Sequence, residues 1–193
     1  MGTQKHLQLI VLAGLSVVAA MLVPSVGRAT GGRYAFAGGT PRQQAEVVRA
    51  LEASSFDWDI VPARITIHIR RGVSSHATPG EIWLDADLLD AGSFAWGVVQ
   101  HEYAHQVDFF LLTSHARAQL LREFGGTAWC APTAVRRDQL GCERFASALA
   151  WAYWPSADNC MRPAGAQAAW VARFRSVVSG LIDTDIRPTG GDH

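Results

Sequence analysis

Hydrophobic and polar residues alternate strictly from Arg64 to Arg70. Isoleucine occupies every second position there, which is the pattern of a strand with one buried face. Residues 81–85 form a second short apolar stretch, and its shortness predicts an edge strand. The segment between them, residues 72–80, is bounded by glycines and is expected to be a loop.

Helical spacing of apolar residues dominates the rest of the chain. Thr40 followed by Pro41 is typical of an N-cap and first helical turn, and predicts an amphipathic helix over residues 42–53. From residue 93 to 111, apolar side chains surround almost the whole helix, which indicates a mostly buried one. Three further helices are expected over residues 115–124, 138–154 and 164–182.

This order of elements, without an internal repeat or a linker, predicts one α+β domain over residues 30–193. The composition agrees, because 49% of the 193 residues are hydrophobic and only 18% are charged. That balance excludes a disordered chain. The 17 basic and 17 acidic residues cancel, and no basic run is present, so we expect no nucleic-acid partner.

The N-terminus has the features of a secretory signal peptide. Lys5 precedes an apolar run over residues 7–23, and small residues follow at Gly27 and Ala29. Cleavage after Ala29 would release a secreted or extracytoplasmic protein, whereas retention of residues 1–29 would leave a membrane anchor.

Three cysteines lie in the last third of the chain, at positions 130, 142 and 160. In an exported protein, one disulfide and one free thiol is the simplest arrangement. We favour Cys130 with Cys142, which closes a short loop.

The string His101-Glu-Tyr-Ala-His105 falls inside the predicted buried helix. Residues four apart share one face of a helix, so both imidazoles can reach the same zinc ion. Glu102 is turned by about 100° from His101, which places it beside such an ion, where it can take a proton from water. The motif therefore predicts a zinc site with Glu102 as general base.

A catalytic zinc also needs a third protein ligand. Asp108 lies on the same helix face but about 7.5 Å along the axis from the expected ion, so we expect it to hold a histidine ring instead. Glu143 opens another apolar helix and is the best-placed ligand, because a buried acid needs a partner.

Other assignments of the third ligand stay open. Glu143 could be exposed and paired with Arg136 or Arg137, or Asp138 or Glu123 could serve as the ligand instead.

Taken together, the strings from His101 to Asp108 and from Glu143 to Ala146 resemble those of gluzincin metallopeptidases. The nearest resemblance is to the lethal-factor-like and Mlc-titration-factor-like groups, which share HExxHxxD and a later ExFA. The resemblance implies a zincin-like fold, with His101, His105 and Glu143 as zinc ligands and Glu102 as the base. It also implies that residues 81–85 are the edge strand along which a substrate peptide lies.

The chain departs from these groups at one position. Lethal-factor-like enzymes carry a tyrosine upstream of the ligand glutamate, where this chain reads Ala134-Val-Arg-Arg137. The candidates for stabilising the transition state are then Arg136, Arg137, Tyr153 and His115.

The sequence thus predicts an exported zinc peptidase whose partner is a peptide or protein substrate. Two alternatives stay open: a zinc-stabilised binding domain without activity, and an amidase that acts on a cell-wall amide.

Overall fold

The computed structural model describes residues 34–130 and 136–186. The predicted signal segment, residues 1–29, lies outside them. None of the helices in the described part is long and apolar enough to cross a membrane.

A four-stranded sheet forms one side of the molecule, in the order β1 (Tyr34–Gly38), β2 (Ile65–Arg70), β4 (Glu81–Asp85), β3 (His76–Thr78). The first three strands are parallel, and β3 runs antiparallel to β4. The mixed helix and sheet content agrees with the predicted α+β class.

The prediction that residues 81–85 form an edge strand is wrong. That segment is β4, which pairs with β2 on one side and with β3 on the other. The edge strand on that side is β3, which lies inside the segment predicted as a loop. The sequence did not reveal this strand because three residues are too few to show an alternating pattern. Gly80, with φ +82°, supplies the backbone conformation that returns the chain from β3 to β4.

Strand β1 was not predicted from the hydrophobic pattern either. Its residues are only partly buried, and it pairs with β2, which is distant in the sequence. The two strands approach closely at Gly38, where an added Cβ would lie 2.9 Å from the carbonyl oxygen of Ile69. Glycine is required there by this approach and by a φ of +90°.

Helix α1 (Pro41–Ala53) is present as predicted, and it follows β1 along the chain and precedes β2. It begins with a capping box: the Gln43 amide donates to the Thr40 hydroxyl at 3.3 Å, and the Thr40 amide donates to Gln43 Oε1 at 2.9 Å. The cap fixes the helix start at the position that the sequence gives.

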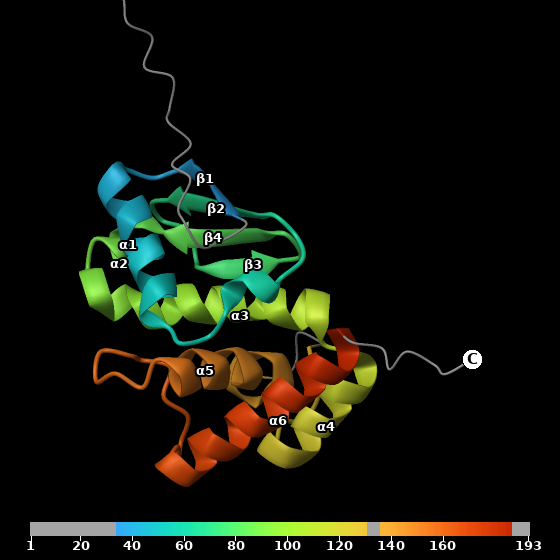
Figure 1. Ribbon diagram of the computed structural model, residues 1–193. Coiled ribbons are helices and arrows are strands. Elements are labelled where there is room, and N and C mark those ends of the chain that lie inside the picture. Colours follow the sequence, from blue (N-terminus) through green and yellow to red (C-terminus); the bar gives the residue numbers. More distant parts are fainter. Residues whose placement is uncertain (1–33, 131–135, 187–193) are drawn as a thin grey trace, which may run out of the picture.

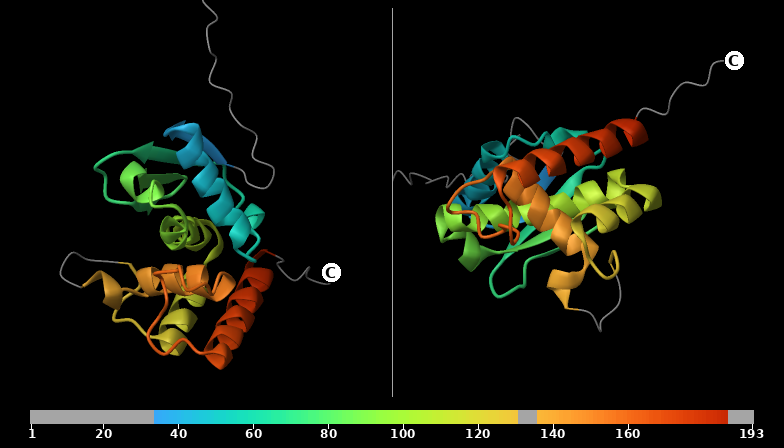
Figure 2. Two further views of the ribbon diagram at one scale, coloured as in Figure 1. Left: turned by 90° about the vertical axis from the view of Figure 1, so that its left-hand side faces the viewer. Right: turned by 90° about the horizontal axis from the view of Figure 1, so that it is seen from below.

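The central element is α3 (Trp96–Leu111), which follows the short α2 (Ala86–Leu89) and a 3₁₀ turn (Gly92–Ala95). Figures 1 and 2 show α3 between the sheet on one side and the last three helices on the other. Every residue from Val99 to Asp108 on this helix is buried, as its apolar pattern predicts.

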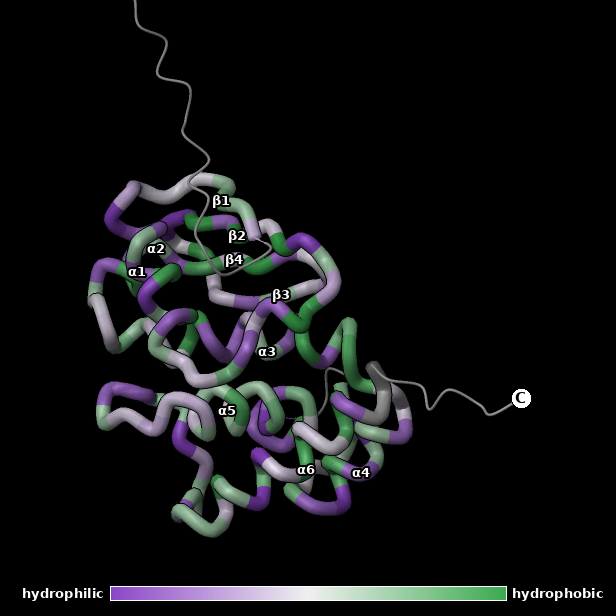
Figure 3. The backbone as a smooth tube through the Cα atoms, viewed as in Figure 1, coloured by the Kyte–Doolittle hydropathy of each residue, from purple (hydrophilic) through white to green (hydrophobic). Residues whose placement is uncertain are grey.

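The other half consists of α4 (Ser114–Phe124), α5 (Gly141–Tyr153) and α6 (Ala168–Ile186). Helix α5 starts later than residue 138, because a separate 3₁₀ turn (Arg137–Gln139) precedes it, and α6 starts later than residue 164. Hydrophobic and hydrophilic stretches alternate along α4 and α6 (Figure 3), as expected for helices with one buried side.

A side-chain contact between β3–β4 and α3 fixes the sheet edge over that helix. Gln106 Nε2 donates to the carbonyls of Thr78 and Glu81, at 2.9 and 3.2 Å, and Gln106 Oε1 accepts from the Gly80 amide at 2.9 Å. These bonds satisfy a fully buried amide and hold the β3 edge near the middle of α3.

Close packing of α3 on the segment after α5 yields the first prediction. A Cβ added at Gly97 would collide with Asn159 Oδ1, and Asn159 in turn donates to the carbonyls of Ala150 and Trp154. We therefore expect Gly97→Ala to lower the free energy of unfolding by about 1–3 kcal/mol, measured by urea denaturation.

The matched control is Gly180→Ala in α6, where an added Cβ meets no atom of the described part of the chain within 4 Å. This change should be neutral or slightly stabilising, since alanine is the better helix former. Equal effects of the two substitutions would contradict the close contact at Gly97.

Candidate metal centre

Helix α3 brings three buried polar side chains together. His101, Glu102 and His105 each offer a ligand atom, and these atoms all lie within 4.8 Å of one another, so the group could hold a metal ion. The two imidazole rings stand edge to face, with centroids 4.9 Å apart. This is the arrangement expected for histidines one helical turn apart.

Glu143, in the first turn of α5, faces the two histidines. Its Oε2 lies 3.3 Å from His101 Nε2 and 3.9 Å from His105 Nε2. The approach is possible because α5 packs on α3 through small residues, of which Ala146 and Ala150 are fully buried. The structure thus places Glu143 beside the motif, as the ligand assignment requires.

Burial shapes the charges of this cluster. It lowers the pKa of His105 to about 4, so the ring is neutral and able to bind a metal at physiological pH. Burial also raises the pKa of Glu102, against the opposing charge of His101. At Glu143 burial also favours a higher pKa, but the hydrogen bond with His101 and the positive charge of Arg137 act against it, and the net effect lowers the pKa.

Ser147, one turn after Glu143, orients the first histidine. His101 Nδ1 lies 3.1 Å from Ser147 Oγ, and that hydroxyl donates to Met161 Sδ at 3.8 Å. A metal bound through Nε2 would require the ring proton on Nδ1, where Ser147 Oγ can accept it while its own hydroxyl donates to Met161 Sδ. Sequence reasoning missed Ser147, although its spacing of four residues from Glu143 places it on the same helix face.

Asp108 is buried, but its hydrogen bonds differ from the predicted ones. Arg117 Nε donates to its Oδ1 at 2.8 Å, and Trp129 Nε1 lies 3.0 Å from both carboxylate oxygens. In the described part of the chain, no hydrogen bond joins Asp108 to a histidine ring. It instead ties the end of α3 to α4, through Arg117, and to the segment before the disulfide, through Trp129.

The predicted disulfide between Cys130 and Cys142 is confirmed, with Cα atoms 5.6 Å apart, and Cys160 is free and exposed. The bridge anchors the residue that directly precedes Glu143. It therefore joins the segment containing Trp129 to the start of α5.

The structure separates the two candidate arginines. Arg137 Nε lies 3.5 Å from Glu143 Oε1, and its charge also acts on Glu102 and His105. Arg136 instead pairs with Asp138, its Nη2 lying 2.9 Å from Oδ2. Of the two, only Arg137 is directed at the cluster.

The remaining candidates lie elsewhere. Tyr153 packs on Phe56 and under the Arg175 guanidinium, and His115 is exposed on α4. Glu123 pairs with Arg173 at 3.0 Å. Within residues 34–130 and 136–186, neither Asp138 nor Glu123 belongs to the histidine cluster.

His76, on β3, is a neighbour of the cluster for which the sequence favoured no role. Its charge acts on Glu102, and its ring stacks on Trp83 with centroids 4.7 Å apart. His68 stacks on the other side of the same indole at 4.8 Å. The three rings form a stack across β2, β4 and the edge strand β3, and His76 is its member nearest to the edge.

Comparisons with known proteins assign no role to this site. No family model, no curated protein and no solved structure matches the chain.

The donor set fits a zinc ion. Two imidazole nitrogens and one carboxylate oxygen converge from α3 and α5, and a buried group of this kind is costly without a partner. If all three bound one zinc ion, a fourth position would be left open, as it is in catalytic zinc sites.

The bond from His101 to Ser147 generates the second prediction. Ser147→Ala removes the group that orients the ring, and we expect zinc affinity to fall roughly 10–100-fold with the fold intact. Competition with a chromophoric chelator measures the affinity. Ser176→Ala, at an exposed position on α6, should leave it unchanged. A zinc affinity unaffected by Ser147→Ala would contradict the orienting role.

Proposed function

We propose that this protein is a zinc-dependent hydrolase that cleaves peptide bonds. The observation that carries the proposal is the convergence of His101, His105 and Glu143, from two helices, beside the buried carboxylate of Glu102. The resemblance of the motif strings to those of gluzincins supports the same function.

Zinc, when bound, would polarise the scissile carbonyl and lower the pKa of water. His101, His105 and Glu143 would hold it, with His101 fixed by Ser147. Glu102 is the group that moves the proton: it accepts one from the attacking water and returns it to the leaving nitrogen. Burial raises its pKa and makes it a stronger base than an exposed glutamate.

Arg137 is our candidate for stabilising the transition state. Its guanidinium is the positive group beside Glu143, and its charge extends to Glu102 and His105. The side chain is mostly exposed, so it is able to turn from Glu143 toward the oxygen of a bound substrate. It would thus fill the role of the tyrosine that this chain lacks.

The β3 edge is our candidate for the strand that binds substrate, in place of the interior strand β4. β3 is the exposed side of the sheet next to α3, held there by Gln106. An extended peptide can add to such an edge through main-chain hydrogen bonds. Its scissile bond would then pass over the histidine cluster.

Export remains part of the proposal. The signal-peptide features of residues 1–29 suggest it, and the Cys130–Cys142 disulfide supports it, because such bonds persist in oxidising compartments.

The third prediction concerns Glu102. Glu102→Gln removes the base and keeps the size of the side chain, so zinc should stay bound while kcat on a fluorogenic peptide library falls about 10²–10⁴-fold. Glu52→Gln, at an exposed position on α1, is the control and should cleave at the wild-type rate. Wild-type protein that binds zinc and cleaves no peptide would overturn the peptidase proposal and favour a binding domain or an amidase.

The fourth prediction separates the two arginines. Arg137→Gln should lower kcat by about 10²-fold and leave KM within roughly a factor of two, because the interaction is made mainly in the transition state. Arg136→Gln should have little effect, since its partner is Asp138. Steady-state kinetics on one peptide decides it. Equal losses in both variants would show that Arg137 has no special role.

A further inference from the structure

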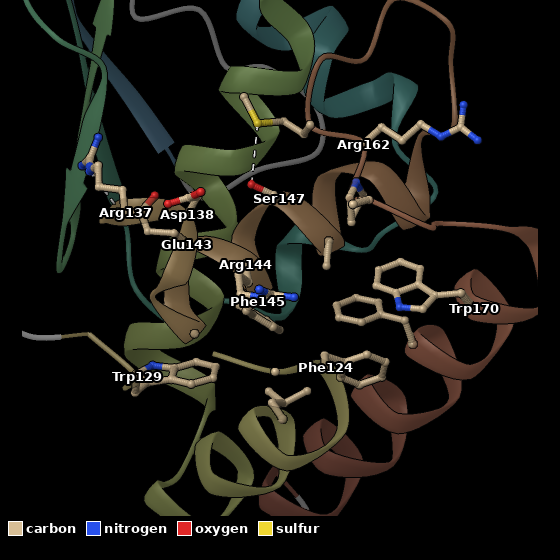
Figure 4. A pocket seen from close by; sticks show the side chains of 18 of the residues that line it. Phe124, Trp129, Arg137, Asp138, Glu143, Arg144, Phe145, Ser147, Arg162 and Trp170 are labelled. Carbon is tan, nitrogen blue, oxygen red and sulfur yellow. Dashed lines mark hydrogen bonds and ion pairs between the residues drawn. The ribbon is translucent and has the colours of Figure 1, made fainter. Parts of the chain in front are cut away.

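A groove extends away from the candidate metal centre across α5. It has a volume of about 460 Å³ and lies between α4, α5, α6 and residues 160–164. Glu143 and Ser147, which contact His101, also line this groove (Figure 4), so the groove adjoins the candidate metal centre. A molecule that lies over the metal centre can therefore continue into the groove.

Aromatic rings form the far end of the groove. Phe124 from α4 and Trp170 and Phe174 from α6 all line it. Trp170 stacks on Phe174 with centroids 5.3 Å apart, and Phe124 meets Phe174 edge to face at 5.1 Å. This aromatic end suits an aromatic or large aliphatic side chain, whose binding is favoured by burial of apolar surface and by ring contacts.

The acidic groups on the groove wall already have basic partners. Glu143 contacts His101 and Arg137, and Asp138 is paired with Arg136. The negative charge of the wall is therefore largely compensated.

Arg144 and Arg162 line the groove too, and both are exposed. Arg162 lies over the ring of Trp151, 5.2 Å from its centroid. Arg144 reaches from α5 toward Gly125, at the end of α4, and no carboxylate pairs with it among the described residues. Since the acidic groups of the wall are paired, the charge that the groove offers to a ligand is the positive charge of these arginines.

We propose that this groove selects the substrate: it binds a peptide segment in which a bulky apolar side chain stands next to an acidic one. The apolar side chain occupies the aromatic end, and the carboxylate pairs with Arg144. The inference rests on the proposed peptidase function, because the groove is continuous with the residues assigned to zinc and its ligand must reach them.

Binding and cleavage are measured separately to test it. The probes are three capped heptapeptides of glycine and serine with Phe-Glu, Phe-Lys or Ala-Glu at the centre. Titration of full-length, zinc-loaded Glu102→Gln protein, followed by tryptophan fluorescence, gives each Kd. We expect the Phe-Glu peptide to bind about tenfold more tightly than either of the others.

Charge reversal locates the preference. Arg144→Glu, placed in the Glu102→Gln protein, should abolish or invert the preference for Phe-Glu over Phe-Lys. Arg122→Glu, at an exposed position on α4 that does not line the groove, should preserve it.

Two failures are distinguishable. Equal affinities for the three peptides, or a Glu preference that survives Arg144→Glu, would overturn the groove assignment even if wild-type protein cleaves peptides. The expected affinities together with no cleavage of Phe-Glu by wild-type protein would support the groove and overturn the proposed function.

Discussion

The packing of α5 against α3 is the contact on which the rest of the site depends. It brings Glu143 to within 3.3 Å of one buried histidine and 3.9 Å of the other. Small side chains such as Ala146 allow this approach, and the disulfide at Cys142 fixes the start of α5. Polar groups buried at such an interface cost free energy unless they are paired, and Glu143 pairs with both histidines.

Three polar residues around that interface position its elements through hydrogen bonds. Ser147 orients His101, Gln106 holds the sheet edge over α3, and Asp108 secures the end of α3 through Arg117 and Trp129. These contacts give the cluster and the elements around it defined hydrogen-bond partners, as a preorganised site requires. The charge beside it that is exposed to solvent is that of Arg137, which pairs with Glu143.

Local patterns in the sequence predicted most helices and the His101–His105 motif, whereas contacts between distant parts of the chain were not predicted. The Thr40 cap and the alternation in β2 are local patterns, so both were predicted. The position of β4 inside the sheet depends on β3, which is too short to recognise, and the partners of Asp108 depend on where Trp129 folds. Glu143 was identifiable because an acid on an apolar helix stands out, but serine at position 147 carries no such signal.

The most direct test of the account is the zinc content of purified protein, measured by elemental analysis on wild type, Glu143→Ala and Asp108→Asn. The account predicts one zinc ion per chain in wild type and in Asp108→Asn, whose role is structural, and loss of zinc in a folded Glu143→Ala. A wild-type protein that binds no zinc after reconstitution, or a Glu143→Ala variant that retains it fully, would contradict the proposed centre.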